Sequence, residues 1–250
     1  MSGTWPPGYG YLPLGEVTST LDEGRARAGA MTGPTWITAT HQTQARGRRG
    51  RAWAHPAGNF AATLVLPRLD DPDSAALRSF VAALALDEAF TMLTGRADAF
   101  ALKWPNDVLL NGGKVAGILL ESLTTRGRLT GLSIGIGVNL AHAPGGDAVE
   151  PGALPPVSLM GETGLAVSPE DFLEALAPAY ARWEGQLATY GFESLRTAWL
   201  ARAARLGDQV TARLPNEEIT GTFRTVDATG QLVLSTPKGE RCIAAGDVFF

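Results

Sequence analysis

The chain has few of the residues that build covalent or metal frameworks. Its 250 residues include one cysteine, Cys242, and three histidines. A single cysteine cannot form a disulfide within the chain, which favours a reducing, cytoplasmic setting. We expect Cys242 to be packed rather than reactive. The histidines, His41, His55 and His142, show no metal-ligand spacing, so the sequence predicts no metal site built from protein side chains.

Long apolar runs and a basic excess are also absent. No run approaches the roughly 20 apolar residues that span a bilayer, and residues 1–11 lack the basic and then apolar order of a signal peptide. The formal net charge of -4 argues against a broad nucleic-acid-binding face. The 45% hydrophobic content is enough for one full-sized domain and a small second one. We therefore expect a cytoplasmic protein with no membrane partner.

Hydrophobic patterning predicts a chain that mixes helices and strands. Helices are expected over 73–93, where Asp73 or Ser74 can cap the start, and over 168–190 and 192–206, which stop at Gly191 and Gly207. Short alternating strands after residue 207 form a tail too short for more than a small β-barrel, so we expect two units, 1–206 and 207–250. The expected strands are 36–40, 60–66, 100–104, 108–110, 115–120, 129–140, 210–214, 219–226 and 231–234, with a hairpin turn at Asn111-Gly112-Gly113.

The most informative segment is Arg46-Gly47-Arg48-Arg49-Gly50-Arg51, which lies between two expected strands. Arginine offers a fixed fork of donors for carboxylate and phosphate oxygens, and glycine lets backbone N–H groups approach such oxygens closely. Because like charges repel, the segment should become ordered when an anion arrives. The pattern favours a clamp for an anionic ligand. Two other interpretations are a basic nucleic-acid patch and a dinucleotide fingerprint, although the latter's first glycine and following helix are missing.

Three further motifs place polar groups at strand ends or within strands. In Lys103-Trp104-Pro105-Asn106-Asp107 the proline ends a strand, which puts Asn106 and Asp107 at its tip, although a plain Asn-Asp turn is the simpler interpretation. In Gly112-Gly113-Lys114 the lysine stands at the mouth of a strand, and Val115 excludes a phosphate loop because Ser or Thr should follow the lysine. Gly131-Leu132-Ser133-Ile134-Gly135 matches a nucleophile elbow, but strand alternation continues through it, so we expect Ser133 to be an ordinary strand residue.

The order of these motifs is more specific than any one of them. The arginine loop is followed by Lys-Trp-Pro-Asn-Asp, then Lys-Val-Ala-Gly-Ile-Leu, then Gly-Ile-Gly-Val-Asn, and this order closely resembles the biotin protein ligases. The resemblance covers roughly residues 15–140 and continues more loosely beyond them. It implies an α+β fold, with a mixed β-sheet catalytic domain related to class II aminoacyl-tRNA synthetases and lipoate ligases, followed by a small C-terminal Src-homology-3-like β-barrel.

The resemblance also implies roles for particular residues. Lys114 and Arg48 would flank the reacting carboxylate and the α-phosphate, with Asp107 near the chemistry. Biotin or its activated carboxyl group would contact Ser19, Thr20, Gln42, Arg46, Gly47, Arg48 and Lys114. The nucleotide would contact Arg51, Trp53, Asn106, Val138 and Asn139. The chain departs from the family pattern at Leu21, Ala45 and Ala52, where asparagine, glycine and a basic residue are common.

The implied enzyme uses ATP, biotin and Mg²⁺, forms biotinyl-5'-AMP and transfers biotin to a lysine of a biotin carboxyl carrier protein of the acetyl-CoA carboxylase type. The first motif begins near Gly15, which leaves no room for the DNA-binding winged helix that many members carry, so no DNA partner is expected. A homodimer is compatible with the resemblance. The alternatives are a lipoate-type ligase, whose triple-glycine, histidine-containing signature is not found here, and an RNA-binding module that uses the arginine loop.

Overall fold

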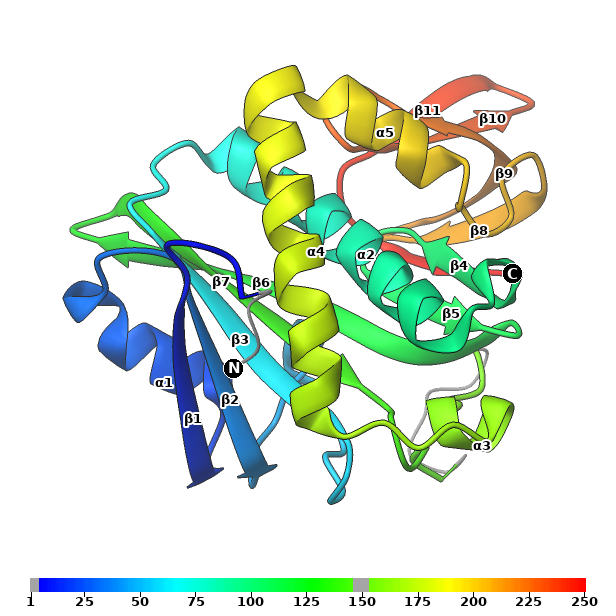
Figure 1. Cartoon of the computed structure of the whole chain (residues 1–250). Coiled ribbons are helices and arrows are strands. Elements are labelled where there is room, and N and C mark those ends of the chain that lie inside the picture. Colours follow the sequence, from blue (N-terminus) through cyan, green and yellow to red (C-terminus); the bar gives the residue numbers. More distant parts are fainter. Residues whose placement is uncertain (1–4, 146–152) are drawn as a thin grey trace.

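The computed structural model describes residues 5–145 and 153–250 and combines a large mixed sheet with a separate C-terminal sheet (Figure 1). The seven strands of the large sheet lie in the order β1-β2-β3-β7-β6-β5-β4. Strands β1 and β2 pair in parallel, and the other neighbours pair antiparallel. The strands are β1 (Gly10–Val17), β2 (Thr35–Gln42), β3 (Phe60–Pro67), β4 (Phe100–Lys103), β5 (Asp107–Leu110), β6 (Gly113–Thr125) and β7 (Arg128–Val138).

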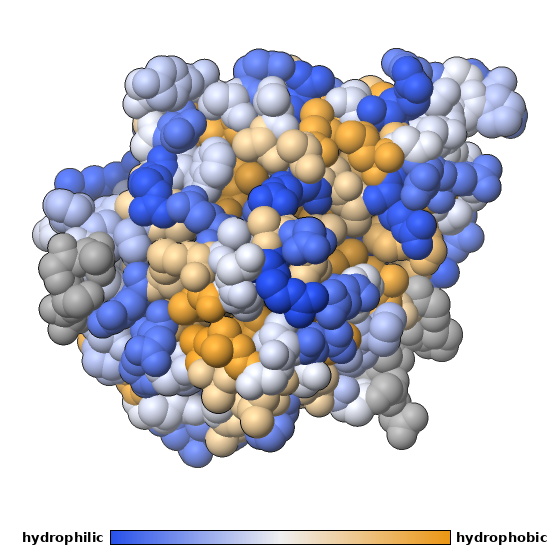
Figure 2. Space-filling model, turned by 45° about the vertical axis from the view of Figure 1, so that its right-hand side comes forward, coloured by the Kyte–Doolittle hydropathy of each residue, from blue (hydrophilic) through white to orange (hydrophobic). Residues whose placement is uncertain are grey.

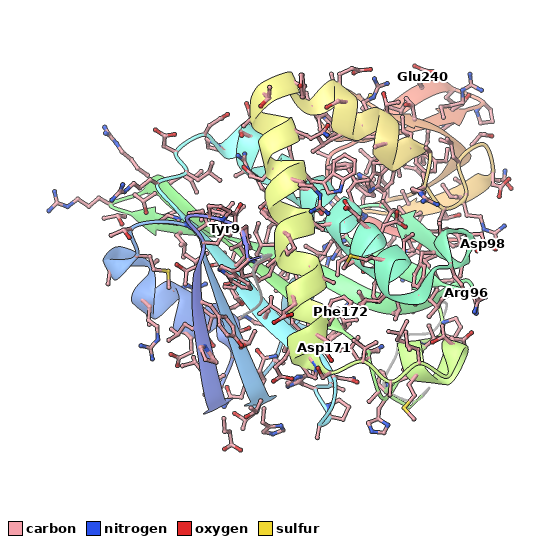
Figure 3. The ribbon with its side chains drawn as sticks, in the orientation of Figure 1. Tyr9, Arg96, Asp98, Asp171, Phe172 and Glu240 are labelled. Atoms are coloured by element: carbon pink, nitrogen blue, oxygen red, sulfur yellow. The ribbon has the colours of Figure 1, made fainter. Side chains whose placement is uncertain are left out.

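Two long helices, α2 (Pro72–Thr94) and α4 (Pro169–Tyr190), lie across one face of the large sheet (Figure 1). Phe172 lies near the start of α4 (Figure 3). Its ring packs edge-on against that of Phe60 of β3, with ring centroids 5.1 Å apart. Short helix α1 contacts β2, β3 and β7. The remaining helices are α1 (Thr20–Arg27), α3 (Leu159–Thr163) and α5 (Phe192–Leu200), with 3-10 turns at Ala28–Ala30, Arg48–Gly50 and Ala97–Ala99.

Strict alternation along β7 gives the large sheet two different faces. Leu132, Ile134, Ile136 and Val138 are buried in the main core with residues of α2 and α4. Successive strand residues point to opposite faces, so Ser133, Gly135 and Gly137 face the other way. The strand alternation predicted from sequence is confirmed, and Ser133 is a buried strand residue. The glycine-bearing face is the one that carries the site described below.

Local signals set most of the helix ends. Helix α2 begins after Asp71, whose carboxylate accepts hydrogen bonds from the amides of Asp73 and Ser74, so the predicted cap at Asp73 or Ser74 is wrong by two or three residues. Helix α4 begins after Ser168 and ends at Gly191, as predicted, and the Ser168 hydroxyl accepts from the amide of Asp171. The β5–β6 turn is also confirmed, because its Asn111 has a φ of 49° and its Gly112 a φ of 84°.

Helix α5 is shorter than predicted, because it ends at Leu200 rather than Leu206. The chain beyond it leaves the helix to pair with the edge of β4. The amide of Leu102 donates to the carbonyl of Arg202, and the amide of Ala204 donates to the carbonyl of Leu102. An unpaired strand edge is a strong competitor for backbone donors and acceptors.

Strand β1 and helix α1 were not predicted, since neither has a marked apolar period.

The C-terminal sheet is antiparallel, with the strand order β11-β10-β9-β8-β12. The indole Nε1 of Trp104 donates to the carbonyl of Gly230 at 3.0 Å, which ties this sheet to the end of β4. Buried residues of both sheets belong to one continuous apolar core. The strands are β8 (Gln209–Arg213), β9 (Glu218–Val226), β10 (Leu232–Thr236), β11 (Gly239–Ile243) and β12 (Asp247–Phe249), of which the last two were not predicted.

The outer surface carries hydrophobic patches between hydrophilic residues on the face that Figure 2 presents. Cys242 lies on β11 and is exposed, so the prediction that it is packed is wrong. Its strand lies at the end of the C-terminal sheet's order, where a side chain can point to solvent. Across residues 5–145 and 153–250, no helix has the length and apolar character needed to cross a membrane.

Candidate active site

A cavity of about 690 Å³ opens on the glycine-bearing face of the large sheet. Its walls come from segments that are distant in sequence: the start of α1, the end of β2, the arginine loop, strands β5 to β7 and the last residues of the chain. Twelve of the thirteen site residues predicted from sequence line it. They are Ser19, Thr20, Gln42, Arg46, Gly47, Arg48, Arg51, Trp53, Asn106, Asp107, Lys114 and Asn139.

Val138 is the predicted site residue that does not line the cavity. Its side chain is fully buried in the main core, on the other face of β7. The alternation of the strand explains this placement, because Gly137 and Asn139 on either side of it line the cavity instead. Any contact of Val138 with a ligand in this cavity would therefore use its backbone.

Paired glycines form part of the cavity floor. Gly117 of β6 and Gly137 of β7 are partners in the ladder. A Cβ atom on Gly137 would lie 2.6 Å from Trp53, and one on Gly117 would lie 3.2 Å from it, so the indole rests directly on the sheet backbone. The Nζ of Lys114 lies 5.4 Å from the centre of the Trp53 ring. Only glycines leave room for this stacked arrangement.

Polar side chains at the start of α1 are held in a fixed network. The hydroxyl of Ser19 caps the helix by accepting from the amide of Leu21 at 3.2 Å. The amide and the hydroxyl of Thr20 both donate to Oε1 of Gln42, at 2.8 and 3.1 Å. Buried Thr63 of β3 donates to the Thr20 hydroxyl at 2.8 Å. Because Oε1 of Gln42 is engaged, the side-chain amide N–H groups are what this residue can offer to a ligand.

His55 fixes the end of β2, a role that the sequence did not predict. Its Nδ1 accepts from the amide of Gln42 at 3.2 Å, and its Nε2 lies 3.0 Å from the carbonyl of Asn59. These partners require a neutral ring with the proton on Nε2. Burial lowers the pKa of His55, with the Asn59 hydrogen bond opposing the shift, and this agrees with the neutral form. A histidine among scattered histidines gave no local signal of this role.

The arginine loop is a closed turn rather than an open strand. Arg46 and Ala52 form a bridge, and the amide of Gly47 donates to the carbonyl of Arg51 at 2.7 Å. Arg49 has a φ of 57° and Gly50 a φ of 72°, which is the left-handed region that glycine adopts readily. The turn therefore presents its guanidinium groups from a compact backbone.

Each arginine of the loop has an acidic partner within the chain. The four are Arg46, Arg48, Arg49 and Arg51. Arg46 donates to Asp22 at 2.8 and 3.0 Å and to Glu121 at 3.0 and 3.2 Å. Arg49 and Arg51 both reach Oδ2 of Asp247, at 2.8 and 2.9 Å. These arginines therefore have anionic partners in the folded chain without a ligand, which the sequence did not lead us to expect. Tertiary folding supplies carboxylates from α1, β6 and β12, which no local pattern reveals.

Arg48 links the loop to two other parts of the cavity wall. It donates to Oδ1 of Asn106 at 3.2 Å and to the carbonyl of Gly246 at 3.0 Å, and it lies 3.4 Å from Oδ1 of Asp247. Burial lowers the pKa of Arg48, against the opposing charges of Asp247 and Asp107. Burial acts to raise the pKa of Asp247, but the hydrogen bond from Arg51 and the arginine charges outweigh it, so this pKa is lowered.

Asp107 lies between two lysines at the mouth of the β5–β6 hairpin. Its Oδ1 is 2.7 Å from Nζ of Lys114, an ion pair without the alignment of a hydrogen bond, and its Oδ2 is 3.8 Å from Nζ of Lys103. Burial lowers the pKa of Lys103, and the charge of Asp107 opposes the shift. Lys103 opens the Lys-Trp-Pro-Asn-Asp motif, but the family resemblance implied no role for it. The arrangement holds two ammonium groups at the cavity wall.

Comparisons with known proteins bear directly on this site. The model of the biotin/lipoate A/B protein ligase family matches residues 11–139, and that of the biotin protein ligase C-terminal domain matches residues 206–250. A biotin--[acetyl-CoA-carboxylase] ligase of Paracoccus denitrificans is 54% identical over 95% of this chain and 99% of its own length. The chain belongs to the biotin protein ligase family.

Other biotin protein ligases are less similar in sequence. A biotin--[acetyl-CoA-carboxylase] ligase of Mycobacterium tuberculosis is 31% identical over 90% of this chain and 82% of its own. The solved biotin protein ligase from Aquifex aeolicus in complex with biotin and ATP is 24% identical, with a TM-score of 0.82 over 96% of this chain and 97% of that one. That structure shows the shared fold, a mixed α/β domain followed by a C-terminal antiparallel sheet, which confirms the expected fold class.

Several residues that line the cavity were not predicted from the sequence. Asp247, Phe249 and Phe250 line the cavity from the end of the chain. They stand nearly 200 positions from the arginine loop and carry no motif, so no sequence signal places them there. Lys103 is the exception, since its position in the Lys-Trp-Pro-Asn-Asp motif, at the end of a short strand, could have indicated it.

Proposed function

We propose that this biotin protein ligase activates biotin with ATP to biotinyl-5'-AMP and then transfers biotin to a lysine of a biotin carrier protein of the acetyl-CoA carboxylase type. The observation that carries the proposal is a single cavity with two kinds of wall. Neutral hydrogen-bonding groups, Thr20 and Gln42 among them, line it together with a cationic group that includes Arg48 and Lys114. The first set suits the ureido and thioether ends of biotin, and the second suits phosphates.

The charges that line the cavity suit an anionic ligand. Four cationic side chains, Arg48, Arg51, Lys103 and Lys114, face it, against two carboxylates, Asp107 and Asp247, which leaves an excess of two positive charges. Arg46 also lines the cavity but is held by Asp22 and Glu121. We propose that Arg46 supports the loop as well as bounding the biotin site, while Arg48 and Lys114 meet the reacting groups.

In the first half-reaction a biotin carboxylate oxygen attacks the α-phosphorus of ATP, and pyrophosphate leaves. Negative charge builds on the α-phosphate oxygens, and positive groups fixed in advance stabilise that charge most effectively. Lys114 is held by Asp107, and Arg48 by Asn106 and the Gly246 carbonyl, so both are positioned without a ligand. Trp53 on its glycine floor offers an aromatic face for the adenine.

We expect Mg²⁺ to reach the cavity as part of the nucleotide substrate. The cavity carboxylates Asp107 and Asp247 are both engaged by cationic side chains, so they do not form a magnesium cage. Magnesium commonly reaches such sites on substrate phosphates, with only one or two protein ligands.

In the second half-reaction the carrier lysine attacks the acyl carbon of the mixed anhydride, and AMP leaves. The attacking amine must lose a proton, and we propose that Asp107, which lies beside Lys114 in the cavity, orients the amine or accepts this proton. The closed arginine turn would keep water from the anhydride, which hydrolyses readily.

We further propose that residues 1–206 form the catalytic unit and 207–250 a C-terminal unit. A homodimer and a cytoplasmic location stay predictions that rest on the sequence.

The decisive experiment is the mass of a biotin carrier domain incubated with this protein, biotin, ATP and Mg²⁺. The expected result is the mass increase of one biotinyl group, with pyrophosphate released even when the carrier is omitted. Lys114→Ala should lower pyrophosphate release by about 10²–10³-fold, because it removes charge stabilisation in the transition state. Lys238→Ala is the matched control, since Lys238 lies in an exposed turn between β10 and β11.

Two outcomes would contradict the proposal. Transfer of lipoate but not biotin under the same conditions would make the protein a lipoate-type ligase. RNA binding that weakens steeply with salt and ignores ATP, without any modified carrier, would support the RNA-binding alternative. An unchanged rate for Lys114→Ala would remove that lysine from the chemistry while leaving the overall reaction intact.

A further inference from the structure

Asp247, near the C-terminus, joins the C-terminal sheet to the arginine turn at the cavity. Its carboxylate is 12% exposed and lies within 3.4 Å of Arg48, 2.8 Å of Arg49 and 2.9 Å of Arg51. The preceding carbonyl, of Gly246, also accepts from Arg48 at 3.0 Å. Three guanidinium groups of one short turn therefore converge on one residue of the C-terminal sheet.

The two partners differ in how firmly their backbones are held. Asp247 begins β12, which pairs with β8 through Asp247 and Arg213. The arginine turn is closed at its base by the Arg46–Ala52 bridge, and its tip, Arg48–Gly50, belongs to no strand of either sheet. A ladder constrains its strand cooperatively, whereas a turn fixed at one bridge opens more easily. The carboxylate of this contact is thus held on a strand of a sheet, and the guanidinium groups are held on a turn.

Charge explains why one carboxylate can control the turn. Arg48, Arg49 and Arg51 repel one another when they are held close, and a shared carboxylate converts that repulsion into charge-assisted hydrogen bonds. Neutralising the carboxylate removes the attraction and leaves the repulsion. The turn should then move away from the cavity wall that Phe249 and Phe250 complete.

We propose that Asp247 is a positioning residue that latches the arginine turn over the cavity, and thereby sets how long the acyl-adenylate is retained before transfer. This rests on the proposed function. Asp247 acts through Arg48, Arg49 and Arg51, and it makes no bond to the reacting atoms. The C-terminal unit consequently takes part in the reaction by determining the lifetime of the bound intermediate.

The test measures escape of biotinyl-5'-AMP from full-length enzyme loaded with biotin, ATP and Mg²⁺. Asp247→Asn keeps the size of the side chain and removes its charge. It should still form adenylate, but its escape rate should rise by about 10- to 100-fold, the range expected for loss of one charge-assisted contact. Lysines of an added bystander protein should then be labelled. Asp247→Glu restores the charge and should recover most of the retention, which a merely structural role would not do.

Two further variants make the test specific. Arg49→Gln breaks the latch from the other side, because Arg49 touches Asp247 but does not line the cavity. Its effect on escape should not add to that of Asp247→Asn, since Asp247→Asn already removes the ion pair that Arg49 makes. Asp208→Asn is the matched control, because Asp208 is 57% exposed and pairs with Arg205 near the start of β8. It should leave escape unchanged.

The outcomes separate the latch from its rivals. Retention equal to that of the unmodified protein in both Asp247→Asn and Arg49→Gln would overturn the latch. Tighter ATP binding by Asp247→Asn with unchanged retention would also overturn it, because the carboxylate would then be a resident anion that competes with phosphate. If Asp247→Asn fails to fold, Arg49→Gln carries the same test. No adenylate from the unmodified protein would instead contradict the proposed function.

Discussion

His55 illustrates how much one side chain can determine without touching a ligand. Its neutral ring accepts from Gln42 and donates to Asn59, so it fixes the end of β2 beside the cavity. Protonation would turn Nδ1 into a donor facing another donor. The same ring thus links the position of a predicted biotin-binding side chain to pH.

We expect the protein to lose stability as the pH falls through the histidine range, in part because of His55. Burial lowers its pKa in the folded state, so below the ordinary value of about 6.5 the unfolded chain binds more protons than the folded one. This part of the stability is complete above about pH 6.5 and is lost on acidification until the folded-state pKa is passed. Thermal unfolding measured between pH 7.5 and 5.5 should show this loss as a falling Tm. Each kcal/mol of lost stability should lower the Tm by roughly 2–4 °C.

The matched variants are His55→Gln and His41→Gln. Glutamine can accept and donate without titrating, so His55→Gln should flatten the pH dependence of Tm. His41 is exposed and its ring centre lies 6.3 Å from that of His55, which makes it a control for a nearby histidine without the two buried bonds. Parallel pH curves for His55→Gln and the unmodified protein would contradict this account.

At the scale of elements, the paired glycines of β6 and β7 leave room for the cavity and for Trp53 on one face of the sheet. Alternation sends Ile136 and Val138 into the core and leaves Gly137 facing the cavity, where Trp53 lies on it. Gly137→Ala should raise the KM for ATP by about 10-fold, an estimate of roughly 1.4 kcal/mol for displacing the indole, while the fold survives. Gly15→Ala in β1 meets no atom within 4 Å and is the control. An unchanged KM would mean that Trp53 does not support the nucleotide.

At the scale of the whole molecule, the two sheets share one apolar core. Phe80 of α2 packs against Trp199 at 5.3 Å, and a Cβ on Gly230 would approach Phe80 to 3.0 Å. We therefore expect one cooperative unfolding transition by calorimetry, since neither unit keeps its buried surface alone. Trp104→Phe, which loses the donor to the Gly230 carbonyl, should lower the Tm of that same transition. Two separated heat-absorption peaks would show that the units unfold independently.

The sequence by itself determined the features whose causes are local. The helix stop at Gly191 and the hairpin turn at Asn111-Gly112 were predictable because caps and turns act within a few residues. The strand alternation that divides the two faces of β7 was equally legible. The order of the motifs also gave the family and most of the residues that line the cavity, because a family conserves spacing along the chain.

Only the tertiary structure decided the contacts that join distant segments. No pattern near Arg49 indicates Asp247, which lies 198 positions away, and none near Leu200 shows that the chain leaves α5 to pair with β4. Ion pairs and edge pairing depend on which surfaces the topology brings together, and the free energy of such a contact is set by burial and geometry at the meeting point. That is why the arginine turn could be recognised from its composition, whereas the carboxylates that hold it could be found only in the folded chain.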